Sequence, residues 1–209
     1  MTDLAHPLWI EPWPLVLASA SASRAALLRA AGIPIDITPA DIEERVIESQ
    51  LVATGASAKD TAVALAIAKA KAVSATRPQR FVLGADQTLV VGSEHLHKPA
   101  GTAEARKQLL KLREREHWLH SGAALVRDGE VIATCLSSAR MVMRAFSEEF
   151  LDRYLAQAGE AVTRSIGSYQ LEGPGIHLFE SIEGDHFTIL GLPLVPLLDI
   201  MRGQGMVIG

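Results

Sequence analysis

Cysteine, aromatic side chains and long apolar runs are scarce in this chain. The 209 residues include one cysteine, Cys135, which excludes an internal disulfide and a cysteine cluster around a metal. No apolar run reaches the length of about 20 residues that a membrane-spanning helix needs. The opening residues include the acids Asp3 and Glu11 and lack the basic start of a secretory signal peptide. We therefore expect a cytoplasmic protein with no membrane partner.

Positive charge is also in short supply. Lys and Arg number 20 against 24 Asp and Glu, which gives a formal net charge of −4. Proteins that bind nucleic acids electrostatically are usually basic, and single-strand binders stack bases on aromatic rings, which make up only 5% of this chain. An RNA-binding module is therefore disfavoured, and we expect no nucleic-acid partner. A local cluster of Lys and Arg can still bind a small anion.

Hydrophobic residues, by contrast, make up 48% of the chain, which is enough for a sizeable core at this length. The sequence has no internal repeat, no low-complexity tract and no convincing linker. We therefore predict a single domain over residues 1–209, in which residues 1–13 form an irregular, proline-containing N-terminal arm.

Helix-like and strand-like segments alternate along the chain. Apolar runs predict strands at 15–19, on both sides of 84–87 and within 167–193. Alternation predicts that the segment 33–44 is extended, and acidic residues follow at its end. Asp128 and Gly129 form a tight-turn signal inside a hairpin over 117–146. Helices are predicted over 21–32, 57–75, 102–114, 147–159 and 194–202, the fourth capped by Ser147. The pattern indicates an α/β (mixed α+β) fold with helices packed on a mixed sheet.

The stretch L-A-S-A-S-A-S-R leads from a predicted strand into a predicted helix. A helix N-terminus offers free N–H groups to an anion, and Ser19 and Ser21 add hydroxyls. Arg24 adds a guanidinium that suits phosphate oxygens. The alternative is an ordinary serine N-cap with a surface arginine. The stretch lacks the glycines and the lysine of a Walker loop.

A carboxylate interrupts the apolar stretch R-F-V-L-G-A-D-Q-T-L-V-V-G between two strand-like segments. Asp86 would be costly there if it were buried and unpaired. It follows a β-rich run, a place where α/β proteins often put chemistry, and Gly84 would allow a close backbone approach. The alternative is a plain turn that joins two strands.

Three further segments offer charges or glycines, each with an ordinary structural alternative. The acidic A-D-I-E-E-R is either a solvated turn or, if Glu44 lies near Asp86, part of a site for Mg²⁺ or Mn²⁺. Lys69 in the alanine-rich helix and Lys98 before a helix start are either surface lysines or phosphate ligands. The G-S-Y-Q-L-E-G-P-G stretch, which contains Glu172, is either a simple connection or a loop that a flat ligand can approach.

The order of these motifs resembles the Maf family of nucleoside triphosphate pyrophosphatases. From Leu15 to Leu198 the chain has S-x-S-x-x-R, D-I-E-E, A-K-A, G-A-D-Q, K-P, G-S-Y-x-x-E-G and G-L-P in the same sequence order. Seven motifs in fixed order are far more specific than any one of them. The resemblance implies an ITPase-like fold with an elongated mixed sheet flanked by helices and a cleft for the nucleotide.

The resemblance also implies an activity. Family members cleave a nucleoside triphosphate to the monophosphate and pyrophosphate, need a divalent metal and are thought to clear non-standard nucleotides. Asp86 matches the proposed general base, Glu44 matches an acidic position that would share the metal with it, and the phosphate-side positions are Ser19, Ser21, Arg24, Lys69 and Lys98. A free aspartate has a pKa of about 4, so we hypothesise that Asp86 acts on water that the metal has made more acidic.

Two residues bear on the choice of base. Gln87 and Glu172 resemble the subgroup that acts on 7-methyl-GTP, whereas many members that act on dTTP and UTP have Thr and Gln there. A carboxylate accepts from both the N1–H and the amino group of guanine, which a glutamine amide cannot do. Ser23 departs from this subgroup, which typically has an aromatic residue there to face the charged methylated ring. We therefore predict a purine preference and leave methyl specificity open.

Other readings remain open. The chain could be a dTTP/UTP pyrophosphatase, an enzyme for inosine-type triphosphates, or a nucleotide-binding regulator of cell division with little catalysis. The resemblance also suggests a homodimer.

Overall fold

The computed structural model describes residues 7–209 of the chain. Part of the predicted irregular arm, residues 1–6, lies outside the described residues. Residues 7–13 form turns and bends, and Trp9 makes an isolated antiparallel bridge with Val207. The amide of Ile10 donates to the carbonyl of Met206 over 3.1 Å. The described part of the arm is therefore bonded to the C-terminal segment, and the arm over 1–13 stays a prediction.

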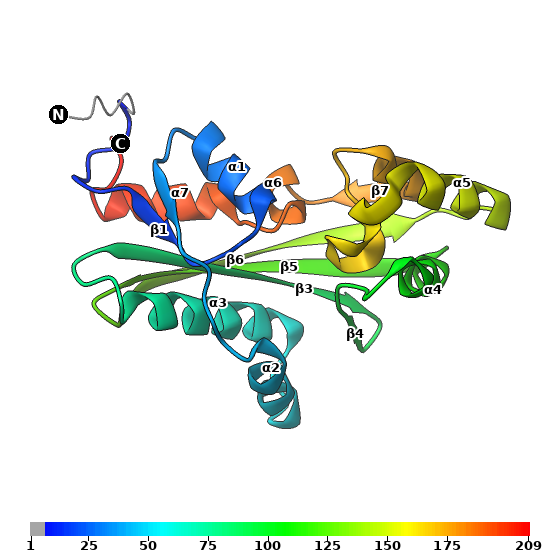
Figure 1. The fold of residues 1–209 in the computed structure, drawn as a ribbon, viewed down its shortest axis with the longest axis horizontal. Helices are drawn as coiled ribbons and strands as arrows, with labels where there is room; N and C mark the ends of the chain where they lie inside the picture. Colours follow the sequence, from blue (N-terminus) through cyan, green and yellow to red (C-terminus); the bar gives the residue numbers. More distant parts are fainter. Residues whose placement is uncertain (1–6) are drawn as a thin grey trace. The chain divides into compact units, whose positions relative to one another are not determined.

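Seven strands of the described chain form one mixed sheet, in the order β2-β1-β3-β5-β6-β7, with β4 paired to β3 (Figure 1). Strand β1 is parallel to β2 and β3, whereas the β3–β4 and β6–β7 pairs are antiparallel. The strands are β1 Leu15–Leu17, β2 Ile35–Ile37, β3 Phe81–Val91, β4 Glu94–Leu96, β5 Glu116–Arg127, β6 Glu130–Met143 and β7 Phe179–Glu183. The prediction of an α/β fold built on a mixed sheet is confirmed.

Helices cover this sheet. They are α1 Ala22–Ala30, α2 Glu44–Ala53, α3 Ala58–Ser74, α4 Thr102–Leu112, α5 Glu148–Ala158, α6 His186–Ile189 and α7 Leu194–Gly203, with 3₁₀ turns η1 Gly159–Thr163, η2 Ile166–Ser168 and η3 Pro174–Leu178. Within residues 7–209, no helix combines the length and the apolar character that a bilayer crossing requires.

The described chain contains two compact units. The first comprises residues up to Gln87, Ser121–Ser137 and Leu190–Gly209, and the second comprises Thr88–His120 and Ser138–Ile189. Strands β3, β5 and β6 each contribute residues to both units. The expectation of a single domain over 1–209 stays a prediction.

In the first unit, α3 lies on one side of the strands, and α1 and α7 lie on the other (Figure 1). Two glycines bring α3 unusually close to the sheet. A Cβ at Gly84 of β3 would overlap the carbonyl oxygen of Ala66 and lie 2.8 Å from the amide nitrogen of Ala70. A Cβ at Gly122 of β5 would lie 2.7 Å from the carbonyl carbon of Ala62. Gly84 is therefore needed for helix packing, and the alanines of α3 give the helix the narrow face that this packing requires.

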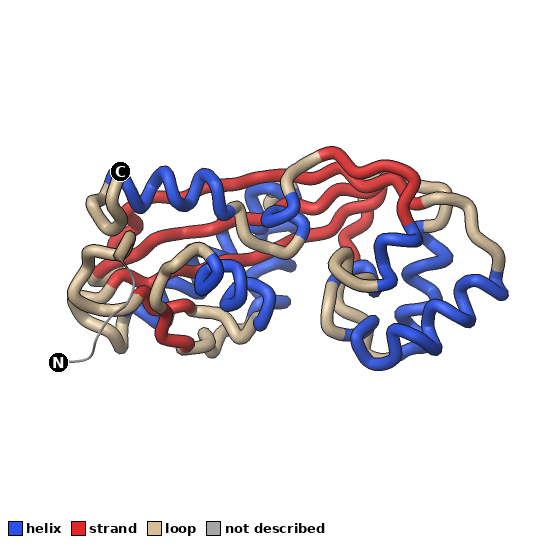
Figure 2. Tube along the Cα trace, turned by 90° about the horizontal axis from the view of Figure 1, so that it is seen from above, coloured by secondary structure: helices blue, strands red, loops and turns tan. Residues whose placement is uncertain are grey.

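The second unit has its own core. Figure 2 shows its strands in one layer, with its helices gathered on one side of them. Buried residues from all of its longer elements form one cluster, which includes Leu89, Leu109, Met141, Leu151 and Leu178. This cluster is the core on which α4, α5 and the 3₁₀ turns of the unit pack.

Several local predictions are confirmed. Asp128 and Gly129, with φ of 50° and 81°, connect β5 to β6 in the conformations of a two-residue hairpin turn. Ser147 caps α5 by accepting from the amide of Phe150. Ser57 caps α3 in a capping box with Asp60, which fixes where this 17-residue helix begins.

Two predictions are wrong, and a third is confirmed in part. The stretch 81–91 is one continuous strand, not two segments broken at 84–87, because Asp86 is paired and does not end the strand. Glu44 does not belong to a simple acidic turn but begins α2, a helix without a buried residue that the sequence analysis did not predict. In the glycine-rich stretch 167–193, the predicted strand character is confirmed for β7, and much of the rest is 3₁₀ turn, since glycines and prolines favour tight turns there.

Candidate active site

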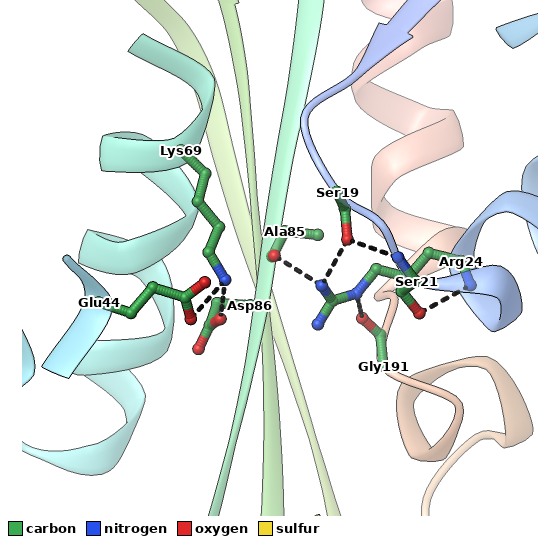
Figure 3. Close-up of polar contacts among 8 residues, drawn as sticks. All are labelled: Ser19, Ser21, Arg24, Glu44, Lys69, Ala85, Asp86 and Gly191. Atoms are coloured by element: carbon green, nitrogen blue, oxygen red, sulfur yellow. Dashed lines mark hydrogen bonds and ion pairs between the residues drawn. The ribbon is translucent and has the colours of Figure 1, made fainter. Parts of the chain in front are cut away.

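The ammonium of Lys69 lies between two carboxylates in the first unit (Figure 3). Its Nζ is 2.6 Å from Oδ1 of Asp86 and 2.9 Å from Oε2 of Glu44. Lys69 comes from the middle of α3, Asp86 from the middle of β3 and Glu44 from the first turn of α2. Three segments that are separate in the sequence thus meet at one charged point.

Burial controls the protonation of Asp86. The residue is only 8% exposed, and this burial raises the pKa of its carboxyl above the ordinary value. Lys69 and Arg24 oppose the rise, because their positive charges favour the ionised form. Glu44 adds to the rise through its negative charge. The site therefore holds a carboxylate that is more basic than a free aspartate, beside two cations that favour its ionised form.

Arg24 ties three segments of the first unit together. Its Nε donates to the carbonyl of Gly191 over 2.8 Å, and its Nη1 donates to the carbonyl of Ala85 over 2.8 Å and to Oγ of Ser19 over 3.1 Å. The residue is buried, and desolvation lowers the pKa of its guanidinium. Nη2 of Arg24 donates no hydrogen bond to any residue within 7–209, and Figure 3 shows this nitrogen without a dashed line. The guanidinium is therefore fixed in orientation with one nitrogen left for a ligand.

The two serines of the strand-to-helix turn have different partners. Ser21 is the N-cap of α1 and accepts from the amide of Arg24, so the ordinary capping role applies to it. Ser19 is buried, and its Oγ accepts from the amide of Ser21 over 3.2 Å and from Arg24. Ser23, the second residue of α1, is half-buried. The turn thus orients Arg24 as well as starting the helix.

Side chains of β3 alternate between its two faces, so neighbours serve different sides of the strand. Figure 3 shows Asp86 on the side of Lys69 and Glu44, with Ser19 and Arg24 on the other side of the strand. The next residue, Gln87, is half-buried, and its Nε2 donates to Oγ of Ser121 in β5 over 3.1 Å. The continuous strand therefore presents the carboxylate and the amide in opposite directions.

Lys98 and Glu172 belong to the second unit. Lys98 is exposed and lies between β4 and α4. Glu172 is exposed in the loop between η2 and η3. Of the sequence-predicted residues, the structure thus gathers Ser19, Ser21, Arg24, Glu44, Lys69 and Asp86 in the first unit and describes Lys98 and Glu172 in the second.

Gly191 is a site residue that sequence reasoning missed. Its carbonyl accepts from Arg24, it has φ of +96°, and a Cβ on it would lie 3.5 Å from Nε of Arg24 and 3.7 Å from Oε1 of Gln87. A left-handed backbone favours glycine here. The G-L-P motif was visible in the sequence, but only the folded chain shows that its glycine faces Arg24.

The donor set suits a hard divalent cation. The carboxylates of Glu44 and Asp86 converge on one point, at 2.9 and 2.6 Å from the ammonium of Lys69. Magnesium in proteins is commonly held by one or two carboxylates together with substrate phosphates. Within residues 7–209 there is no group of three or more His, Cys, Asp or Glu side chains arranged to hold a metal. Two carboxylates would leave the other coordination positions to waters and substrate oxygens.

Comparisons with known proteins agree with the motif order. Residues 14–204 match the family model described as Maf-like protein. The chain is 53% identical over 198 residues to a nucleoside triphosphate pyrophosphatase of Rhodopseudomonas palustris, which covers 94% of this chain and 96% of the relative. It is 49% identical over 195 residues to a 7-methyl-GTP pyrophosphatase of Mesorhizobium japonicum, covering 93% of this chain and 98% of the relative.

Among solved structures, the chain is similar to a HAM1 protein from Coxiella burnetii, with a TM-score of 0.43 and 22% identity over 62% of this chain and 72% of that chain.

The family match extends over both compact units and includes every sequence-predicted site residue. This chain therefore belongs to the Maf family.

Proposed function

We propose that this protein is a nucleoside triphosphate pyrophosphatase, which hydrolyses its substrate to the monophosphate and pyrophosphate. One observation carries the proposal: the ammonium of Lys69 is held between Glu44 and the buried Asp86. The family membership and the names of relatives that are about 50% identical support it.

The cations would bind the phosphates. Cleavage builds negative charge on the departing pyrophosphate, and fixed positive groups stabilise that charge. Arg24 would offer Nη2, because its Nε and Nη1 are committed to carbonyls that fix the plane of the guanidinium. Ser19, Lys69 and Lys98 would add further donors, and Ser21 would act mainly through the cap that orients Arg24.

Asp86 would act as the general base. Proton transfer is most efficient when the pKa of the base lies near the working pH, and burial moves the pKa of Asp86 in that direction. The carboxylate would take a proton from a water as the water oxygen attacks the α-phosphorus. The bond from that phosphorus to the bridging oxygen of pyrophosphate then breaks.

Glu44 and Asp86 would hold a divalent cation, Mg²⁺ or Mn²⁺. When bound, such an ion supplies positive charge to the phosphate oxygens and makes a neighbouring water more acidic. Lys69 would then remain as the cation that keeps Asp86 ionised.

The cysteine has no part in this chemistry. Burial raises the pKa of Cys135 to about 11, so its thiol is protonated at neutral pH and is a poor nucleophile. We place the enzyme in the cytoplasm, clearing non-standard nucleotides, and the expected homodimer stays a prediction.

We further propose a preference for guanine-type bases. Glu172 is exposed in its loop, where its carboxylate could accept from two adjacent N–H donors of a guanine edge. Gln87 and the relative named 7-methyl-GTP pyrophosphatase are consistent with this preference. Ser23 offers no aromatic face to a methylated ring, so we expect little gain from the methyl group.

The reaction can be tested by its products in ¹⁸O-labelled water. Hydrolysis at the α-phosphorus predicts one monophosphate per pyrophosphate, with the label in the monophosphate. Release of orthophosphate and diphosphate, or tight binding without turnover as expected for a regulatory protein, would refute the proposal.

The base preference needs a separate panel of GTP, 7-methyl-GTP, ITP, XTP, UTP and dTTP, assayed with the wild type and Glu172→Gln. We expect the ratio of kcat/KM for GTP to that for UTP to fall about tenfold in the variant, since an amide loses one acceptor. Faster wild-type turnover of UTP and dTTP than of all guanine nucleotides would sink the guanine preference while leaving the reaction itself intact. Faster turnover of ITP and XTP would instead indicate an enzyme for deaminated nucleotides.

A further inference from the structure

The side-chain amide of Gln108 in α4 is buried, and its nitrogen and its oxygen bond to two different segments of the chain. The side chain is 7% exposed. Its Nε2 donates to the carbonyl oxygen of His97 over 2.7 Å, and its Oε1 accepts from Oγ of Ser168 over 3.1 Å. None of the motifs discussed above includes Gln108.

Each partner of Gln108 lies beside a proposed substrate residue. His97 immediately precedes Lys98 in the chain, and Ser168 begins the loop that carries Glu172. We propose that Gln108 is a positioning residue that sets Lys98 for the phosphates and Glu172 for the base of the same nucleotide. This inference rests on the proposed function of both residues, and all five residues belong to the second unit.

The chemistry of the partners fixes the amide. The carbonyl of His97 can only accept, so it requires the NH₂ end of Gln108 and leaves the oxygen for the hydroxyl of Ser168. A carboxylate at position 108 would face the His97 carbonyl without a proton to share. An apolar side chain would leave a buried carbonyl and a buried hydroxyl without a partner, which is costly. Glutamine is thus the side chain of the right length that satisfies both groups.

The start of the Glu172 loop is fixed by further bonds. The hydroxyl of Tyr154 donates to the carbonyl of Ser168 over 3.0 Å, and the hydroxyl of Ser165 donates to the carbonyl of Tyr169 over 2.5 Å. Ser168 itself is in the left-handed region, with φ of 65°, which is unusual for a residue with a side chain. Because the turn is held in this conformation, it sets the position and direction in which the following residues start.

The rest of the loop has an internal bond, from the amide of Gly173 to the carbonyl of Gln170 over 3.2 Å, and it borders a pocket. Gln170, Pro174 and Gly175 line a pocket of about 190 Å³, together with Tyr154, Gln157, Ala158, Ala161 and Val162. The loop that carries Glu172 therefore borders this pocket on either side of Glu172, and the anchored turn fixes where the loop begins. Loss of the Gln108 bond to Ser168 should therefore change the position of Glu172, because the backbone connects the two residues.

Two variants separate the two ends of the amide. Gln108→Met keeps the length of the side chain but removes both bonds, whereas Ser168→Ala removes only the bond on the loop side. Lys107→Met, at an exposed neighbouring position of α4, is the matched control. Two readouts report on the two sides: the inhibition constant of pyrophosphate for the Lys98 side, and the ratio of kcat/KM for GTP to that for UTP for the Glu172 side.

We expect Gln108→Met to weaken pyrophosphate inhibition about tenfold and to reduce base discrimination about tenfold, with kcat changed less than about threefold. Ser168→Ala should reduce only base discrimination, and Lys107→Met should change neither. A folded Gln108→Met enzyme in which both readouts equal those of the wild type would overturn the inference, because a purely structural residue would change stability alone. Absence of pyrophosphate release by the wild type would instead refute the proposed function. In that case equilibrium binding of pyrophosphate, GTP and UTP to the same variants would still test the role of Gln108.

Discussion

Lys69 holds the carboxylate of Asp86 at 2.6 Å in a site where both side chains are nearly excluded from solvent. A buried carboxylate without a partner would take up a proton. The lysine therefore decides how far the pKa of Asp86 rises, and this pair links the packing of α3 to the chemistry proposed at β3.

Lys69→Met should raise the pKa of Asp86 further, because it removes one of the two positive charges that oppose the effect of burial and leaves only that of Arg24. We expect kcat/KM at pH 7 to fall by about 100-fold or more and the acidic limb of the pH–rate profile to move to higher pH. Lys71→Met, at an exposed position of the same helix, should leave both unchanged. A Lys69→Met profile that keeps the wild-type acidic limb would show that Lys69 does not control Asp86.

Gly84→Ala tests the close packing of α3 on β3. The new Cβ would overlap the backbone of Ala66 and Ala70, which cannot move without displacing the helix. We expect the free energy of unfolding to fall by about 3 kcal/mol, measured by urea denaturation, with a loss of activity as Lys69 shifts. Gly203→Ala in α7 adds its Cβ where no atom lies within 4 Å, so stability there should be unchanged or slightly higher. Equal stability of the two variants would contradict this packing.

His117 should make the protein sensitive to acid. It is buried, its Nε2 lies 2.8 Å from the hydroxyl of Tyr169, and burial lowers its pKa to about 4 despite the nearby charge of Glu116. The unfolded chain binds a proton below about pH 6.5, while the folded chain resists it down to about pH 4. The free energy of unfolding should therefore fall as the pH is lowered from 6.5 to 4, by roughly 3 kcal/mol from this residue.

His117→Gln provides the comparison, since glutamine can still bond to Tyr169 but does not titrate. The difference in unfolding free energy between wild type and variant should be constant above pH 6.5 and shrink below it. A difference that stays constant down to pH 4 would mean that His117 is not the acid-sensitive group.

Local chemistry made much of the fold predictable. The hairpin follows from Asp128-Gly129, and the starts of α1, α3 and α5 follow from Ser21, Ser57 and Ser147, because caps and turns depend on a few adjacent residues. Helix α2 escaped prediction although Ile47 and Leu51 have helical spacing, and it is a helix that buries no residue in the core. The continuity of β3 escaped because the partner of Asp86 is 17 positions away in the sequence.

The residues of the candidate site were easier to choose than their roles. Arg24 stood out as a cation beside a helix start, but its bonds to Ala85 and Gly191 join positions 61 and 167 residues apart. Gly84 suggested a close backbone approach, and the backbone that approaches it is that of α3. Contacts between distant segments leave no local pattern, so the sequence could propose these residues but not what they touch.

The turnover of Asp86→Asn under saturating Mg²⁺ tests the central claim most directly. Asparagine keeps the shape of the side chain but cannot accept the proton of the attacking water, and Asp36→Asn, at an exposed position of β2, serves as control. We predict that pyrophosphate release by Asp86→Asn falls by about 100-fold or more, while Asp36→Asn retains wild-type turnover. Near-normal turnover of Asp86→Asn at saturating Mg²⁺ would contradict the account.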